Sequence, residues 1–89
     1  MNILGVRKIA AEYGITVSDF YYCPYERQWT CELDLPPGFS FSYCDYHSVP
    51  VFLDDVDSTW SKSEACEELA GVIREEGRDI NPCTCGENP

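Results

Sequence analysis

The stretch QWTCELDL, Gln28–Leu35, alternates apolar and polar residues without interruption. Its apolar positions are Trp29, Cys31, Leu33 and Leu35, and its polar positions are Gln28, Thr30, Glu32 and Asp34. Because successive side chains of a strand point to opposite faces of a sheet, this alternation predicts a β-strand with one buried and one exposed face. It is the clearest strand in the sequence.

Further extended runs lie on both sides of this strand. Residues 15–23, ITVSDFYYC, are β-branched and aromatic, and a turn at 24–27 joins them to the strand, which predicts an antiparallel hairpin. Residues 39–43, FSFSY, alternate again, and residues 48–56, SVPVFLDDV, form a fourth run. Pro50 has no N–H to donate, so we expect this last run at a sheet edge. The pattern predicts an antiparallel meander of three to four strands.

A helix is predicted before and after the strands. Apolar residues recur at helical spacing over residues 3–13, and Gly14 has the conformational freedom to end that helix. Ser61 and Glu64 have the spacing of a capping box, an apolar stripe follows them, and Gly77 is expected to end the second helix. The predicted class is α+β, with the C-terminal helix packed on one face of the sheet.

Length and composition predict one domain. The chain has 89 residues, of which 44% are hydrophobic, so it is long enough for one core and too apolar to be disordered. We expect the domain to span residues 1–80 and residues 81–89 to form an irregular, cysteine-containing tail. The sequence shows neither a signal peptide nor a membrane span, so we expect a cytoplasmic protein of a host cell that does not associate with membranes.

The cysteines allow more than one interpretation. They are Cys23, Cys31, Cys44, Cys66, Cys83 and Cys85. In a reducing cytoplasm they are expected to be thiols or metal ligands, while their even number in a short chain keeps a disulfide framework open.

A possible DNA-binding motif occurs at Ile9–Tyr21, IAAEYGITVSDFY, whose small residue, glycine and apolar residue resemble the bend of a helix-turn-helix. The second helix would fall on residues 16–26, TVSDFYYCPYE, which carry Asp19 and Glu26 but no Lys or Arg, and Pro24 would cut this helix short. A recognition helix needs cations near phosphates, so the favoured interpretation is helix, glycine and strand, with no direct binding of nucleic acid.

The net charge points instead to a basic protein as partner. The chain carries 16 acidic residues against 6 basic ones, a formal charge of −10. The acidic residues predicted to bind a partner are Asp54, Asp55, Asp57, Glu64, Glu67, Glu68, Glu75 and Glu76. Such carboxylates can imitate phosphates on a surface built to bind nucleic acid. The alternative is a solvated helix face; it suits Glu67 and Glu68 but not Glu75 and Glu76, which lie at the unfavourable end of the helix dipole.

Aromatic residues are too numerous for all of them to be buried under one helix, so some are expected on the surface. Tyr25, Tyr46 and Trp60 lie near predicted loops and are the expected anchors of a protein interface.

Zinc is the alternative cofactor; otherwise no cofactor is indicated. Two residues separate Cys44 from His47, and one separates Cys83 from Cys85, which would make a Cys3His site if the two segments met. This alternative describes a small zinc- or thiol-containing structural or redox protein that uses these four residues. The sequence contains no catalytic motif, and a nucleophile such as Cys44 beside His47 lacks a third group, so we do not expect an enzyme.

In size, charge and lack of a catalytic motif, the chain is similar to the class of phage and mobile-element inhibitors that includes anti-CRISPR and restriction-blocking proteins. This likeness implies a protein that inhibits a larger, basic nucleic-acid-binding protein by occupying its DNA- or RNA-binding surface. No motif identifies a family, and the sequence leaves the oligomeric state open.

Overall fold

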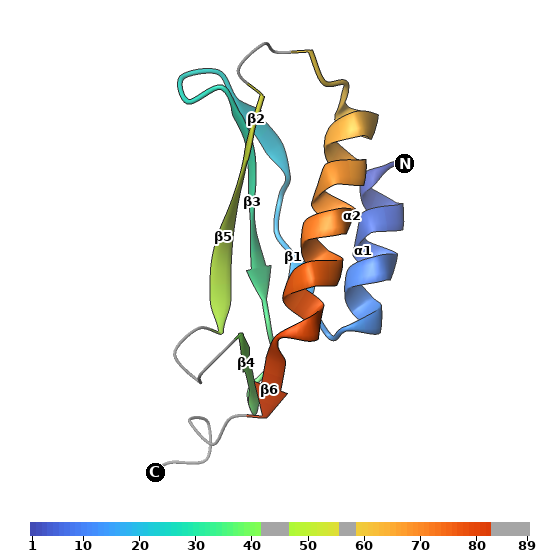
Figure 1. Ribbon diagram of the computed structural model, residues 1–89, viewed down its shortest axis with the longest axis vertical. Coiled ribbons are helices and arrows are strands. Elements are labelled where there is room, and N and C mark those ends of the chain that lie inside the picture. The colour runs from blue at the N-terminus through green and yellow to red at the C-terminus, as the bar shows by residue number, and fades with distance from the viewer. Residues whose placement is uncertain (42–46, 56–58, 83–89) are drawn as a thin grey trace.

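The computed structural model of the chain describes residues 1–41, 47–55 and 59–82. Its elements, in chain order, are α1 (Ile3–Glu12), β1 (Thr16–Val17), β2 (Tyr21–Cys23), β3 (Gln28–Asp34), β4 (Phe39–Phe41), β5 (Ser48–Asp54), α2 (Lys62–Arg78) and β6 (Ile80–Pro82). Figure 1 shows the main sheet on one side of the molecule and both helices on the other. The predicted α+β class is confirmed.

The main sheet is built around β3. β1 and β2 pair with one edge of β3 and β5 pairs with the other, and all three pairings are antiparallel. The predicted hairpin of β2 and β3 is confirmed. Within the described part of the chain β5 pairs only with β3, so Pro50 lies in an edge strand, as expected from its missing N–H.

The structure differs from a simple meander at β4. This strand pairs with β6 in a second, two-stranded sheet, in which Phe39 lies opposite Pro82 and Phe41 opposite Ile80. Gly38, with φ of 94°, turns the chain after β3, and β5 rather than β4 returns to the edge of β3. Residues 81 and 82, expected in the irregular tail, therefore form part of a strand, whereas 83–89 lie outside the described residues.

The N-terminal stretch is helix, glycine and strand. α1 ends before Gly14, which has a φ of 76°, and the chain then enters β1. A left-handed residue at this position ends a helix and is easiest for glycine. A second helix of a helix-turn-helix is absent here, because residues 15–23 contain β1 and β2.

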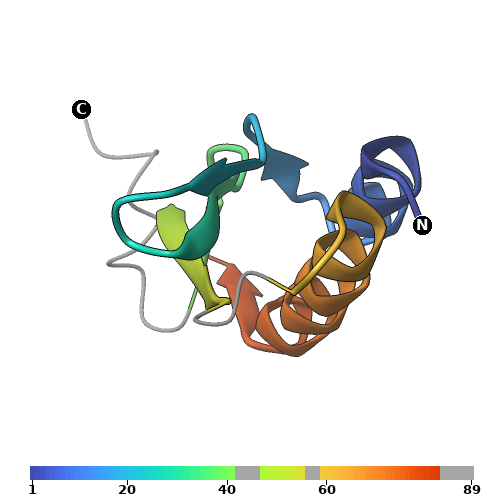
Figure 2. The ribbon, with the colours of Figure 1, turned by 90° about the horizontal axis from the view of Figure 1, so that it is seen from above.

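The two helices run in the same direction (Figure 1) and lie side by side over one face of the sheet (Figure 2). At one end the amino group of Met1 donates to Ser63 Oγ at 2.8 Å. The predicted capping box of α2 is confirmed, since Glu64 N donates to Ser61 Oγ and the Glu64 carboxylate accepts from Ser61 N.

Gly77 has a different role from the one predicted. It does not end α2, which continues to Arg78. A Cβ atom on residue 77 would lie 2.4 Å from Tyr13 Cδ1, closer than atoms can pack. The glycine therefore permits the close approach of α2 to the end of α1.

The core lies between the helices and the inner face of the main sheet. It contains Val6 and Ala10 of α1, Ala65, Cys66, Leu69 and Ile73 of α2, and Ile15, Val17, Phe20, Cys31, Leu33, Phe41 and Val51 from the strands and their connections. The apolar positions predicted for β3 point into this core, because Cys31 and Leu33 are buried whereas Glu32 between them is exposed.

Candidate partner-binding surfaces

The outer face of α2 carries a row of carboxylates. Glu64, Glu68 and Glu75 recur at helical spacing on the side away from the core, and Glu67 lies beside them; all four are exposed. We call these four residues the α2 acidic face. Helical geometry spaces Glu64 and Glu68 about 6 Å apart and extends the row over about 16 Å.

Two members of this region are less free than the sequence suggested. The carboxylate of Glu64 accepts from the hydroxyl of Ser61 at 3.2 Å, as part of the cap. Glu76 is half-buried. Glu67, Glu68 and Glu75 are therefore the residues most available to a partner.

Of the two described aspartates at the end of β5, one is exposed and the other is buried. Asp54 is exposed, and its Oδ1 accepts from Gln28 Nε2 at 2.9 Å. Asp55 is only 4% exposed, and its carboxylate oxygens accept from the backbone N–H groups of Thr59 and Trp60 at 2.9 and 3.0 Å. The expectation that Asp55 contacts a partner is thus corrected, because its carboxylate is buried and binds the backbone N–H groups of Thr59 and Trp60. Asp57 lies outside the described residues.

The predicted aromatic anchors also differ from one another. Tyr25, in the turn between β2 and β3, is 95% exposed. Trp60 is half-buried and lines a cavity of about 190 Å³ together with Tyr22, Trp29 and Asp55. Tyr46 lies outside the described residues. Among the three, Tyr25 alone is shown to be a freely exposed ring.

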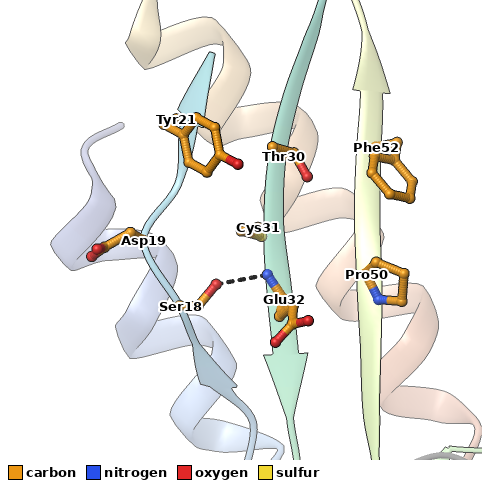
Figure 3. A pocket seen from close by; sticks show the side chains of 8 residues that line it. All are labelled: Ser18, Asp19, Tyr21, Thr30, Cys31, Glu32, Pro50 and Phe52. Carbon is orange, nitrogen blue, oxygen red and sulfur yellow. Dashed lines mark hydrogen bonds between the residues drawn. The ribbon is translucent and has the colours of Figure 1, made fainter. Parts of the chain in front are cut away.

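A second surface, not expected from the sequence, is the face of the main sheet that the helices leave uncovered. Tyr21 of β2 lies opposite Thr30 of β3, and Thr30 lies opposite Phe52 of β5, so that the three form one row across the sheet (Figure 3). Tyr21 and Phe52 are 57% and 60% exposed. With the next row, formed by Ser18, Glu32 and Pro50, they line a hollow of about 320 Å³.

A β-bulge places Tyr21 on this open face. Val17 pairs with Leu33 and Tyr21 pairs with Thr30, so three residues, 18–20, face only two residues of β3. The extra residue reverses the alternation of the chain, which lets Phe20 point into the core and Tyr21 point out. Ser18 maintains the pairing at the bulge, because its Oγ accepts from Glu32 N at 2.7 Å.

The strands that form this open face contain no Lys or Arg. Five of the six Lys and Arg residues, namely Arg7, Lys8, Lys62, Arg74 and Arg78, belong to the two helices, and Arg27 lies in the turn after β2. The strands and the bulge instead carry Asp19, Glu32, Asp34 and Asp54. The open face is therefore acidic without an intervening positive side chain.

Two of the thiols belong to the core. Cys31 and Cys66 are free and buried, and Cys23 is free and half-buried. Burial, with a smaller contribution from the charge of Glu32, raises the pKa of Cys31 from 9.0 to about 12. Burial also raises the pKa of Cys66. Neither buried thiol has the thiolate character of a reactive cysteine.

Of the predicted metal ligands, the structure describes His47 alone. Its Nδ1 lies 2.7 Å from the carbonyl oxygen of Phe39, and Cys44, Cys83 and Cys85 lie outside the described residues. Residues 1–41, 47–55 and 59–82 contain no group of three His, Cys, Asp or Glu side chains arranged to hold a metal ion.

Comparisons of the chain with protein-family models, curated proteins and solved structures give no match. Neither helix of the described chain has the length and apolar character required to cross a membrane.

Proposed function

We propose that this protein is a small acidic inhibitor, acting in the cytoplasm of a host cell, that binds a larger nucleic-acid-binding protein and occupies its DNA- or RNA-binding surface. The observation that carries the proposal is the α2 acidic face, whose four carboxylates are exposed. A basic groove releases its bound anions when phosphates bind to it, and it also releases them when fixed carboxylates take the place of the phosphates.

The position of Glu75 supports a role in binding rather than in stability. Acidic residues near a helix N-terminus interact favourably with the helix dipole, so the first-turn residue Glu64 has a structural explanation. Glu75 lies near the opposite end of α2, where negative charge is unfavourable, yet it remains exposed and in line with Glu68. Because the helix is already ordered, the spacing of these charges is fixed before binding, and binding does not have to pay the entropy cost of ordering their backbone.

The test is capture of partners from a bacterial lysate with the tagged protein, followed by elution with duplex DNA. The proposal expects a nucleic-acid-binding protein that DNA displaces and whose own DNA binding is inhibited by the purified chain. The variant Glu67→Lys/Glu75→Lys should lose this capture and inhibition.

A variant with the same change in net charge provides the control. Glu12 ends α1 and Glu26 lies in the β2–β3 turn, and both are exposed. Glu12→Lys/Glu26→Lys should retain most of the inhibition if the α2 acidic face is the contact. Equal loss in both variants would show that net charge alone governs the interaction and would contradict a specific surface.

A second candidate, a zinc-binding structural or redox protein using Cys44, His47, Cys83 and Cys85, is favoured by one observation. Phe39 lies opposite Pro82 in the second sheet, and the carbonyl oxygen of Phe39 accepts a hydrogen bond from His47 Nδ1. A backbone carbonyl on one ring nitrogen is a common way of orienting a histidine whose other nitrogen binds metal. Bound zinc at one ion per chain, lost in His47→Ala, would support this function; no bound zinc would exclude it.

A further inference from the structure

The hollow on the open face has the form of a site for a single inserted side chain. The rings of Tyr21 and Phe52 stand on its two sides, and Thr30 and Glu32 of β3 lie between them (Figure 3). β2 and β5 are separated by two strand spacings, about 10 Å, with β3 between them. The bulge at 18–20 produces this arrangement by turning Tyr21 outward.

The charges on the open face select the type of partner. Asp19 and Glu32 line the hollow, and the strands contribute no Lys or Arg to this side of the sheet. Nucleic acid would be repelled, and a second copy would present the same negative face to its own image. Addition of a strand along β5 is disfavoured because Pro50 interrupts its hydrogen-bonding edge. A cationic protein segment is the occupant with complementary charge.

We propose that the hollow binds an arginine side chain of the basic partner, with the guanidinium against the rings of Tyr21 and Phe52 and paired with the carboxylate of Glu32. The proposal rests on the proposed function, because it assumes a basic partner, and it adds a second contact surface to the α2 acidic face. Arginine fits better than lysine, since its planar guanidinium stacks on aromatic rings and pairs with a carboxylate at the same time.

The first experiment uses capped hexa-arginine and hexa-lysine peptides as probes. Titration of the ¹⁵N-labelled chain at about 150 mM salt, where distant surface charges are screened, is followed by NMR. The expected result is tighter binding of the arginine peptide, with the largest shifts at the amides of Tyr21, Thr30 and Phe52. Shifts confined to α2, with equal affinity for both peptides, would overturn the arginine site while leaving the acidic face as a binding surface.

Variants then separate the rings from general electrostatics. Tyr21→Leu/Phe52→Leu keeps apolar bulk but removes the aromatic faces, and should weaken binding of the arginine peptide about tenfold and abolish its advantage over lysine. Tyr25→Leu is the matched control, because Tyr25 is more exposed than either ring yet does not line the hollow. Glu32→Gln should weaken the binding of both the arginine and the lysine peptide.

The proposed function and the arginine site can fail separately. If DNA still displaces a captured partner and Tyr21→Leu/Phe52→Leu inhibits it as well as the parent chain does, the hollow is not the contact and this inference is overturned. If the arginine peptide binds the hollow selectively but no captured protein is displaced by DNA, the arginine site stands and the nucleic-acid-mimic function fails. Circular dichroism of each variant checks that the fold is retained.

Discussion

The two faces of the main sheet are made by the same strands and have opposite environments. On the inner face Leu33 is 0% exposed beneath the helices, and on the outer face its neighbour Glu32 is exposed. Two exposed rings, Tyr21 and Phe52, stand on that outer face, whereas Phe20, one residue before Tyr21, is buried. Adjacent residues thus lie either in the core or on an exposed face, and substitutions can test the two environments separately.

The largest effect is expected on the inner face. Leu33→Ala removes a fully buried side chain from the core and should lower the free energy of unfolding by about 2–5 kcal/mol. Glu32→Gln, one residue away on the outer face, should change it by less than about 0.5 kcal/mol. Urea denaturation of both variants measures the difference, and similar losses would show that the two faces are not distinct.

The next largest effect on stability is expected at the contact between the two helices that cover the inner face. Gly77→Ala places a Cβ atom against the ring of Tyr13 and should destabilise the protein by about 1–3 kcal/mol, despite the better helix propensity of alanine. Gly71→Ala is the control, because a Cβ there meets nothing within 4 Å. It should stabilise the protein by up to about 1 kcal/mol. Thermal unfolding of the two variants measures these changes, and equal shifts in Tm would contradict the close approach of α2 to α1 at Gly77.

A third effect, confined to alkaline pH, is expected from the inner-face thiol Cys31. Its pKa in the folded protein is about 12, against 9.0 for an unperturbed thiol, because of burial first and the charge of Glu32 second. Below pH 9 the thiol is protonated in both states. Between pH 9 and 12 the unfolded chain loses the proton while the folded chain retains it, so stability falls as pH rises.

Urea denaturation as a function of pH tests this linkage. Cys31→Ala should show a shallower loss of stability between pH 9 and 12 than the parent chain, whatever its stability at pH 7. If the stability of Cys31→Ala falls as steeply with pH as that of the parent chain, the loss of stability at alkaline pH comes from other titrating groups.

The smallest effect on stability is expected on the outer face. Phe52→Leu changes a side chain that is 60% exposed and should alter the free energy of unfolding by less than about 0.5 kcal/mol. A clear loss of stability, measured by the same urea titration, would mean that this ring supports the sheet and would weaken the distinction between the faces.

Local patterns in the sequence predicted those features that depend on local physics. The alternation in 28–34 correctly separates the faces of β3, Ser61 and Glu64 form the predicted cap, and Gly14 ends α1. These features depend on side-chain periodicity or on hydrogen bonds within one turn, and both are visible in the sequence.

Features that depend on distant contacts were not predicted. In the sequence Gly77 resembles a residue that ends a helix, but the structure explains the glycine by the ring of Tyr13, which leaves no room for a Cβ atom. An aspartate in an acidic run resembles a surface residue, whereas Asp55 is buried by the loop amides that it binds. The open-face site depends on the bulge before Tyr21, and a change of register by one residue has no compositional signal.

The pairing of β4 with β6 also has a consequence for biosynthesis. Because the ribosome makes the chain from its N-terminus, all residues of the main sheet and of α1 are synthesised before those of β6. β4 pairs with a segment close to the end of the described chain, and this contact spans both β5 and α2. Because contacts between distant segments form late, we expect the second sheet to close only after translation has passed residue 82, as the last step of folding.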